Sequence, residues 1–215
     1  MADANFYTDC PDLRFLAEEF IDWKAILDVK MDFGSEDCPF DDTDEAIATF
    51  VAMLEDPIGS LAAQRIAPRA EEVDTQGCKL VDGTVEFPEG LQRNLKDLED
   101  AQLMGLTIPP EYGGLGFPET FYTLAIEMIS RADASLMNFF GLQGGIAETI
   151  EHFANDALKE KYLPLMADGS FTGAMALTEA DAGSKLSPFP TPTLPNSNTP
   201  ILQSFTAPLP LNTEY

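Results

Sequence analysis

Apolar residues recur every three or four positions along most of the first 169 residues, and this spacing constrains the fold more than any other feature. The first stripe runs from Leu13 to Leu27 and predicts one helix with a single apolar face. Similar patterns predict later helices over Leu91 to near Gly105, Glu119 to Arg131, Ser135 to Phe153 and Asp156 to Asp168. The chain up to Gly169 is therefore predicted to be mostly helical.

A second apolar face, over residues 47–66, predicts a long helix near the amino terminus. Thr43 or Asp44 is the expected cap of this helix. Pro57 should kink or divide it, because proline removes a helical hydrogen bond, and Pro68 should end it.

Glycine and proline mark the segments that should not be helical. Cys78 to Gly90 is predicted to form a short hairpin or an extended loop, with Asp82-Gly83 as its turn. Ile108 to Pro118 should be a shaped loop. Phe171 to Leu177 is predicted to be a strand. The tail from Ser187 contains seven prolines and a single charged residue, and disorder is expected there.

These patterns divide the chain into four parts. We expect an acidic helical lead (1–42), a helical amino-terminal domain (43–169), the start of a β domain (170–186) and a tail rich in Pro, Ser and Thr (187–215). The predicted fold class is mainly α.

The excess of acidic residues limits the kinds of partner that the protein is expected to bind. The chain has 37 acidic and 12 basic residues, which argues against a nucleic-acid surface because neutralising phosphates needs clustered Lys and Arg. Residues 1–60 hold 16 acidic and 3 basic residues. A solvated, solubilising face is the favoured interpretation of this excess, and an acidic recognition surface is the alternative.

The remaining composition argues for a reducing compartment and against membrane insertion. Cys10, Cys38 and Cys78 are odd in number and widely spaced, so neither a disulfide framework nor a metal site is predicted. The opening lacks the basic and apolar regions of a targeting peptide, and no 18 apolar residues run together. We expect a cytoplasmic protein.

Three blocks, taken together, resemble one known family. They are "GLTIPPEYGGLGFP", "KEKYLPLMADGSFTGAMALTE" and the motif that ends them, Thr178-Glu179-Ala180-Asp181-Ala182-Gly183-Ser184-Lys185. In order and spacing they resemble the acyl-CoA dehydrogenases, whose pattern at the motif is T-E-P-x-A-G-S-D. Ala180 and Lys185 depart from it. The long lead is most similar to the subgroup related to 3-methylmercaptopropionyl-CoA dehydrogenase.

The resemblance implies an FAD site at the motif. The residues it assigns to the flavin are Met175, Ala176, Leu177, Thr178, Glu179, Ala182, Gly183 and Ser184, with Thr178 near the flavin N5 and Ser184 also on the acyl-CoA substrate. A flavin needs amide and hydroxyl donors where negative charge collects as hydride arrives, and a strand end offers both. A turn without a ligand is the alternative. The resemblance also implies an electron-transfer flavoprotein or other acceptor, and a homo-oligomer.

No catalytic base is predicted in this chain. Resemblance stops at Leu186, before the parts of the family that complete the β domain and the helical bundle with its glutamate base. A structural role is expected for Glu179. The predicted function is acyl-CoA dehydrogenation by an FAD enzyme, here as a truncated and inactive chain. The alternative is a non-catalytic helical fragment or interaction module from a truncated or mis-spliced gene.

Other candidate residues favour structural roles. His152, the only histidine, is expected on a helix surface or at a cap. Met104, Met128 and Met137 are predicted to fill the core. Phe139, Phe140 and Leu142 should either border the acyl cavity or pack in the core. The glycines of "EYGGLG" do not follow a strand, so a dinucleotide site is not predicted.

Overall fold

The computed structural model of the protein describes residues 4–35 and 38–174, and this part of the chain is mainly helical. The α-helices are α1 (Pro11–Phe15), α2 (Trp23–Lys30), α3 (Thr43–Met53), α4 (Ala70–Gln76), α5 (Glu89–Asp100), α6 (Glu119–Ala132), α7 (Phe140–Phe153) and α8 (Asp156–Ala167). Strands β1 (Lys79–Val81) and β2 (Thr84–Glu86) pair as one hairpin. The predicted mainly α class is confirmed.

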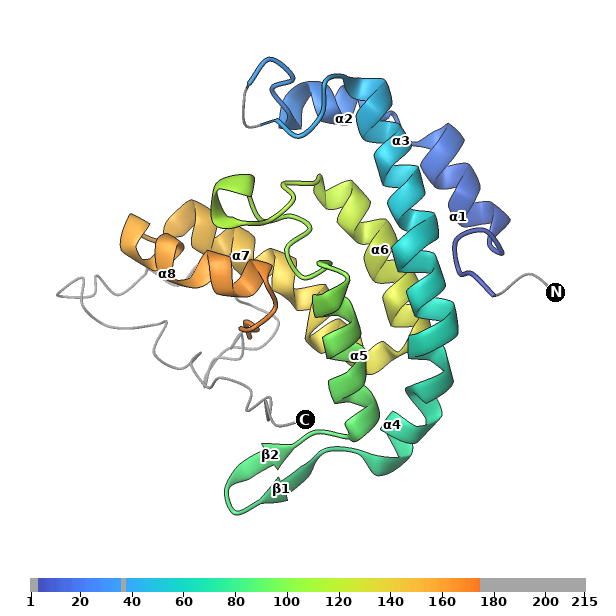
Figure 1. The fold of residues 1–215 in the computed structure, drawn as a ribbon, viewed down its shortest axis with the longest axis vertical. Helices are drawn as coiled ribbons and strands as arrows, with labels where there is room; N and C mark the ends of the chain where they lie inside the picture. Colours follow the sequence, from blue (N-terminus) through green and yellow to red (C-terminus); the bar gives the residue numbers. More distant parts are fainter. Residues whose placement is uncertain (1–3, 36–37, 175–215) are drawn as a thin grey trace, which may run out of the picture.

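One nearly continuous helical run forms the long axis of the molecule (Figure 1). Between α3 and α4 it contains the π-helical segments η2 (Leu54–Gly59) and η3 (Ala62–Ile66) and the 3-10 turn η4 (Ala67–Arg69). Helix α6 packs beside η2 and η3, whereas α1 lies on the other side of the run in this view. The run therefore joins the lead to the later helices.

The limits of this run differ from those predicted. Its cap is Asp42, whose side chain accepts a hydrogen bond from the amide of Glu45, so the prediction of Thr43 or Asp44 is wrong by one or two residues. Asp56, before Pro57, has non-helical dihedral angles, and the predicted division there is confirmed. Pro68 does not end the run. It lies in the first turn of η4, where a missing amide is tolerated, and the run continues to Gln76.

The lead is two helical pieces rather than the single helix that its apolar stripe predicted. The segment η1 (Leu16–Phe20) continues α1, and the chain then turns at Ile21, whose ψ is 123°. Asp22 caps α2 by accepting from the amide of Ala25. Because of this break, Phe20 is 69% exposed instead of lying in the core.

The hairpin and the shaped loop are confirmed. Val81 pairs with Thr84, and Asp82 and Gly83 both have positive φ, as a two-residue hairpin turn requires. The helix predicted over Leu91 to near Gly105 ends earlier, at Asp100. In the loop, the amide of Gly116 donates to the carbonyl of Ile108 at 2.8 Å. The 3-10 turn η5 (Pro110–Tyr112) is its only helical turn among the described residues.

The later helices follow the predictions with one exception. The 3-10 segment η6 (Ala134–Asn138) precedes α7, so the helix expected from Ser135 begins at Phe140. Asn155 caps α8, and Gly169 follows its end with a φ of +83°. A large apolar core joins the lead to α5, α6 and the start of α7. A smaller core joins α7, α8 and the loop residue Ile108.

The run Thr43–Gln76 is long and apolar enough to cross a membrane by length and composition alone, and the core helices of soluble proteins meet the same criterion. Phe50, Leu54, Ile58 and Ile66 of this run are completely buried within the protein. The part of its apolar face that these residues form is therefore already covered by protein side chains.

Candidate functional site

The residues predicted to contact the flavin lie outside the described residues. They are Met175, Ala176, Leu177, Thr178, Glu179, Ala182, Gly183 and Ser184. Residues 175–177 of the predicted strand lie there too, and the prediction is wrong for residues 171–174, which form no strand. The described structure therefore defines the support on which this segment begins.

Residues 170–174, which follow α8, are attached to the last turn of that helix. The amide of Phe171 donates to the carbonyl of Leu165 at 2.9 Å, and the amide of Ser170 donates to Asp168 Oδ1 at 2.8 Å. The rings of Phe171 and Tyr162 lie 5.6 Å apart. The direction in which the chain leaves α8 is thus set by local contacts.

Gln143 on α7 holds the same segment from the other side. Its Nε2 donates to the carbonyls of Met166 at 3.0 Å and Phe171 at 3.1 Å, and its Oε1 accepts from the amide of Gly173 at 3.1 Å. Gln143 is 1% exposed. This residue was not predicted from the sequence. In the sequence, Gln143 stands among glycines in "GLQGGI", and nothing there indicates its role. All of its hydrogen-bond partners are backbone atoms more than twenty positions away.

The helix that carries Gln143 is itself held by α6. The hydroxyl of Tyr122 donates to the carbonyl of Phe140 and accepts from the amide of Gly144 at 3.1 Å. A tyrosine hydroxyl is protonated at neutral pH, and burial raises the pKa of this one further, so it remains a donor. The ring of Tyr122 lies so close to Gly144 that a Cβ there would be 2.5 Å from it.

The apolar candidates divide between core and surface. Met104, Met128 and Phe140 are buried, as predicted for core residues, but Met137 is 38% exposed, so its predicted core position is wrong. It lies on η6, ahead of the helix expected to bury it. Phe139 is half-buried and its ring contacts Phe87 edge to face. It stays a prediction that an acyl cavity is bordered by Phe139, Phe140 and Leu142.

His152 lies on the surface of α7, as expected. Its imidazole Nε2 is 3.7 Å from Glu148 Oε1, and its side chain is 57% exposed. Within residues 4–35 and 38–174 no group of three or more His, Cys, Asp or Glu side chains is arranged to hold a metal ion.

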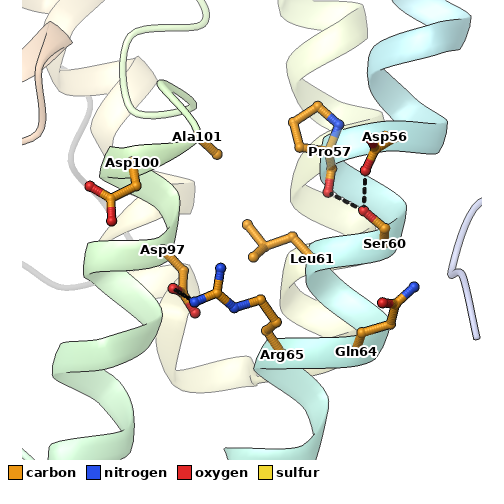
Figure 2. Close-up of a pocket in the computed structure, with 9 residues that line it drawn as sticks. All are labelled: Asp56, Pro57, Ser60, Leu61, Gln64, Arg65, Asp97, Asp100 and Ala101. Atoms are coloured by element: carbon orange, nitrogen blue, oxygen red, sulfur yellow. Dashed lines mark hydrogen bonds and ion pairs between the residues drawn. The ribbon is translucent and has the colours of Figure 1, made fainter.

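A pocket of about 290 Å³ lies between η2, η3 and α5, in a place that no motif predicted (Figure 2). Arg65 extends across it to Asp97, with Nη2 and Oδ1 2.5 Å apart, and Ser60 donates to Asp56. Arg69 also pairs with Asp97 at 2.7 Å. The ion pair between Arg65 and Asp97 thus crosses the pocket and links η3 to α5.

The described residues fit a supporting role toward a flavin. No buried side-chain nitrogen or oxygen in the described part of the chain lacks a hydrogen-bond partner, so none of these is left over as a donor for a cofactor. The attachments of Phe171 and Gly173 end immediately before the predicted flavin segment.

Comparison with known proteins decides the family. The sequence model described as acyl-CoA dehydrogenase, N-terminal domain, matches residues 51–170. The chain belongs to the acyl-CoA dehydrogenase family. The matched residues include the long helical run from Val51 onward, the hairpin, and all of α5 to α8.

Individual acyl-CoA dehydrogenases are similar over most of the chain. The 3-methylmercaptopropionyl-CoA dehydrogenase of Ruegeria pomeroyi is 30% identical over 82% of this chain and 28% of its own length. The mitochondrial isovaleryl-CoA dehydrogenase of Arabidopsis thaliana is 32% identical over 80% and 39%. An acyl-CoA dehydrogenase of Bacillus subtilis is 35% identical over 61% and 32%. The chain spans less than two fifths of the length of these curated relatives.

Proposed function

We propose that this chain supplies the helical amino-terminal domain and the adjoining flavin segment of an FAD-dependent oxidoreductase. Its reaction would be the oxidation of an acyl-CoA thioester between the α and β carbons. The observation that carries the proposal is continuity along the chain. The family match ends at residue 170, the attached segment 170–174 continues directly from it, and the motif that contains Thr178 and Ser184 follows that segment.

Bound FAD would supply the hydride acceptor for this oxidation. The hydroxyl of Thr178 and the nearby amides of Leu177 and Glu179 would donate hydrogen bonds toward the developing negative charge. Ala182 and Gly183 would let the main chain approach the ring system, since they carry little or no side chain. Met175 and Ala176 would begin the contact, and Ser184 would reach the acyl-CoA.

The substrate class rests on the names of the relatives. Isovaleryl-CoA dehydrogenase and 3-methylmercaptopropionyl-CoA dehydrogenase are both named for acyl-CoA thioesters. We propose an acyl-CoA thioester for this protein as well, with an electron-transfer flavoprotein or another acceptor taking the electrons. A homo-oligomer in the cytoplasm, without nucleic-acid binding or membrane insertion, completes the proposal.

The general base is proposed to lie outside residues 1–215. Removing the α proton requires a carboxylate held within reach of the thioester. Among the described glutamates, partial burial raises the pKa of Glu99. Glu99 pairs with Lys96 at 3.4 Å, and Glu119 is exposed at the first turn of α6. Neither has the environment of a substrate base, so this chain alone should form no enoyl-CoA.

The proposal is tested by FAD binding and product formation with the purified 215-residue chain. Equilibrium dialysis should show FAD bound to the chain, and Thr178→Val should weaken the binding about tenfold because a hydrogen-bond donor is lost. Thr149→Val is the matched control, since the Thr149 hydroxyl donates to Gly145 on the exposed face of α7. If the chain binds no FAD, the assignment of residues 175–184 to the flavin is wrong and a non-catalytic module is favoured. Formation of enoyl-CoA would contradict the proposal that the general base lies outside residues 1–215.

A further inference from the structure

Gln143 directs all of its side-chain hydrogen bonds at the start of the predicted flavin segment and at the helix end before it. Two donated bonds reach the carbonyls of Met166 and Phe171, and one accepted bond comes from the amide of Gly173. A primary amide is suited to this position because it donates and accepts from one buried, uncharged group.

The backbone atoms that Gln143 contacts need a side-chain partner. The carbonyl of Met166 belongs to the last turn of α8, where no later helical amide is available. Phe171 and Gly173 lie beyond the helix, without a strand partner in the described part of the chain. Buried backbone groups without hydrogen bonds are costly, so Gln143 stabilises this path of the chain over others.

Gly173 packs directly against the helix that carries Gln143. A Cβ at Gly173 would lie 2.6 Å from Cγ2 of Ile146, one turn further along α7. The close approach therefore needs glycine, and it brings the Gly173 amide within reach of Gln143 Oε1. The hydrogen bond and the packing contact fix the same residue.

Little chain separates this attachment from the proposed flavin contacts. Met175 follows Gly173 by two residues and Thr178 follows it by five, a span of at most about 17 Å if fully extended. We expect a displacement of Gly173 to shift the Thr178 hydroxyl, because so few residues separate the two. Hydrogen bonds to a reacting group lose their effect when the donor is misplaced by about 1 Å.

We infer that Gln143 is a positioning residue that sets where the flavin segment begins, and thereby the affinity of the site for FAD. This inference rests on the proposed function, because it takes residues 175–184 as the flavin segment. Gln143 acts through the backbone of Phe171 and Gly173, not by contact with the cofactor.

The experiment compares the full chain with its Gln143→Met variant, which keeps the length of the side chain and removes all three hydrogen bonds. Hydrogen exchange resolved to single amides should show at least tenfold faster exchange at Gly173 in the variant, with unchanged protection in α6. The Kd for FAD should rise about tenfold, the equivalent of one net hydrogen bond. Gln92→Met is the matched control, since Gln92 makes one bond to the backbone of Phe87 on the exposed side of α5.

A second variant keeps the inference testable if Gln143→Met does not fold. Gly173→Ala leaves Gln143 intact and pushes the segment away from Ile146, so it should produce the same two effects. Unchanged exchange at Gly173 in Gln143→Met, or faster exchange with an unchanged Kd for FAD, would overturn the inference. If the unsubstituted chain does not bind FAD, this counts against the proposed function instead. The rate of hydrogen exchange at the Gly173 amide then still decides whether Gln143 fixes the segment.

Discussion

The hydroxyl of Tyr122 bridges the first turn of α7, accepting from the amide of Gly144 at 3.1 Å and donating to the carbonyl of Phe140. Those two backbone groups are four residues apart, the spacing of an α-helical hydrogen bond. Tyr122 is 4% exposed and comes from α6, so the contact ties α6 to the helix that carries Gln143.

Tyr122→Phe should therefore lower the free energy of unfolding by about 1 kcal/mol, because two buried backbone groups lose their bridging partner. Urea denaturation followed by circular dichroism measures the change. Tyr112→Phe is the control on the half-buried turn η5 and should leave the denaturation midpoint unchanged. Equal midpoints for Tyr122→Phe and the unsubstituted chain would show that the bridge contributes nothing.

Two adjacent glycines of α7 should respond to alanine in opposite directions. A Cβ at Gly144 would be 2.5 Å from the Tyr122 ring, whereas a Cβ at Gly145 would meet nothing within 4 Å. Gly144→Ala should cost about 1–3 kcal/mol through overpacking. Gly145→Ala should add up to about 1 kcal/mol, because alanine favours the helix more than glycine does.

Thermal denaturation of the two single variants, measured side by side, checks this prediction. Each variant is the control for the other, since both make the same chemical change in the same helix. Destabilisation by both would mean that α7 needs glycine at 145 for a reason other than space. Stabilisation by both would mean that Tyr122 moves away readily.

Asp97 holds two arginines and is expected to be the most sensitive charged residue of α5. Its side chain is 6% exposed and pairs with Arg65 at 2.5 Å and Arg69 at 2.7 Å. Arg69 is also bound to Asn94 Oδ1 at 2.8 Å. Asp97→Ala should cost about 3 kcal/mol, because it leaves the partly buried guanidinium group of Arg69 without its carboxylate partner.

Denaturation with urea at low and moderate salt measures this loss, and the loss should change little with salt because the Arg69 and Asp97 side chains are only 21% and 6% exposed. Asp100→Asn is the matched control on the same pocket. Its side chain is 63% exposed and pairs with Lys96, so its removal should have a much smaller effect. A similar effect for both substitutions would refute a special role for Asp97.

Much of the fold was predictable because the helices are defined by local patterns. Helices α6 and α8 have clear apolar periodicity, and the Asp82-Gly83 turn is specified by two residues that accept positive φ. The break at Ile21 was missed because the apolar spacing continues across it. The continuation past Pro68 was missed because proline is compatible with the first turn of a helix as well as with its end.

The candidate site was less predictable from the sequence. The motif around Thr178 can be recognised from residue types, but the segment before it is held by Gln143, which binds backbone atoms at Met166, Phe171 and Gly173. A hydrogen bond to a backbone atom does not depend on the residue type of the partner, so the sequence does not reveal it. The three are brought to one amide by the packing of α7 on α8, a tertiary relationship that apolar spacing does not encode.

Glu99 gives the stability of the protein a pH dependence with a defined sign. Burial is the largest cause that raises its pKa above the ordinary value of 4.5, and Lys96 only partly offsets it. Well below pH 4.5 the carboxyl is mostly protonated in both the folded and unfolded states, so Glu99 costs almost nothing. As the pH rises from 4.5 through the higher folded pKa, the unfolded state releases its proton first, and Glu99 increasingly destabilises the fold.

Glu99→Gln should therefore raise the unfolding midpoint at pH 7 and leave it nearly unchanged below pH 4.5. The physical reason is that the amide has no charge to desolvate next to Gly169 and Met104, where Glu99 packs. Urea denaturation from pH 3.5 to pH 8 measures the difference between the two proteins, with the exposed Glu71→Gln on α4 as the control for a general change in net charge. A Glu99→Gln chain that is less stable at pH 7 would mean that the ion pair with Lys96 outweighs the burial of the carboxylate.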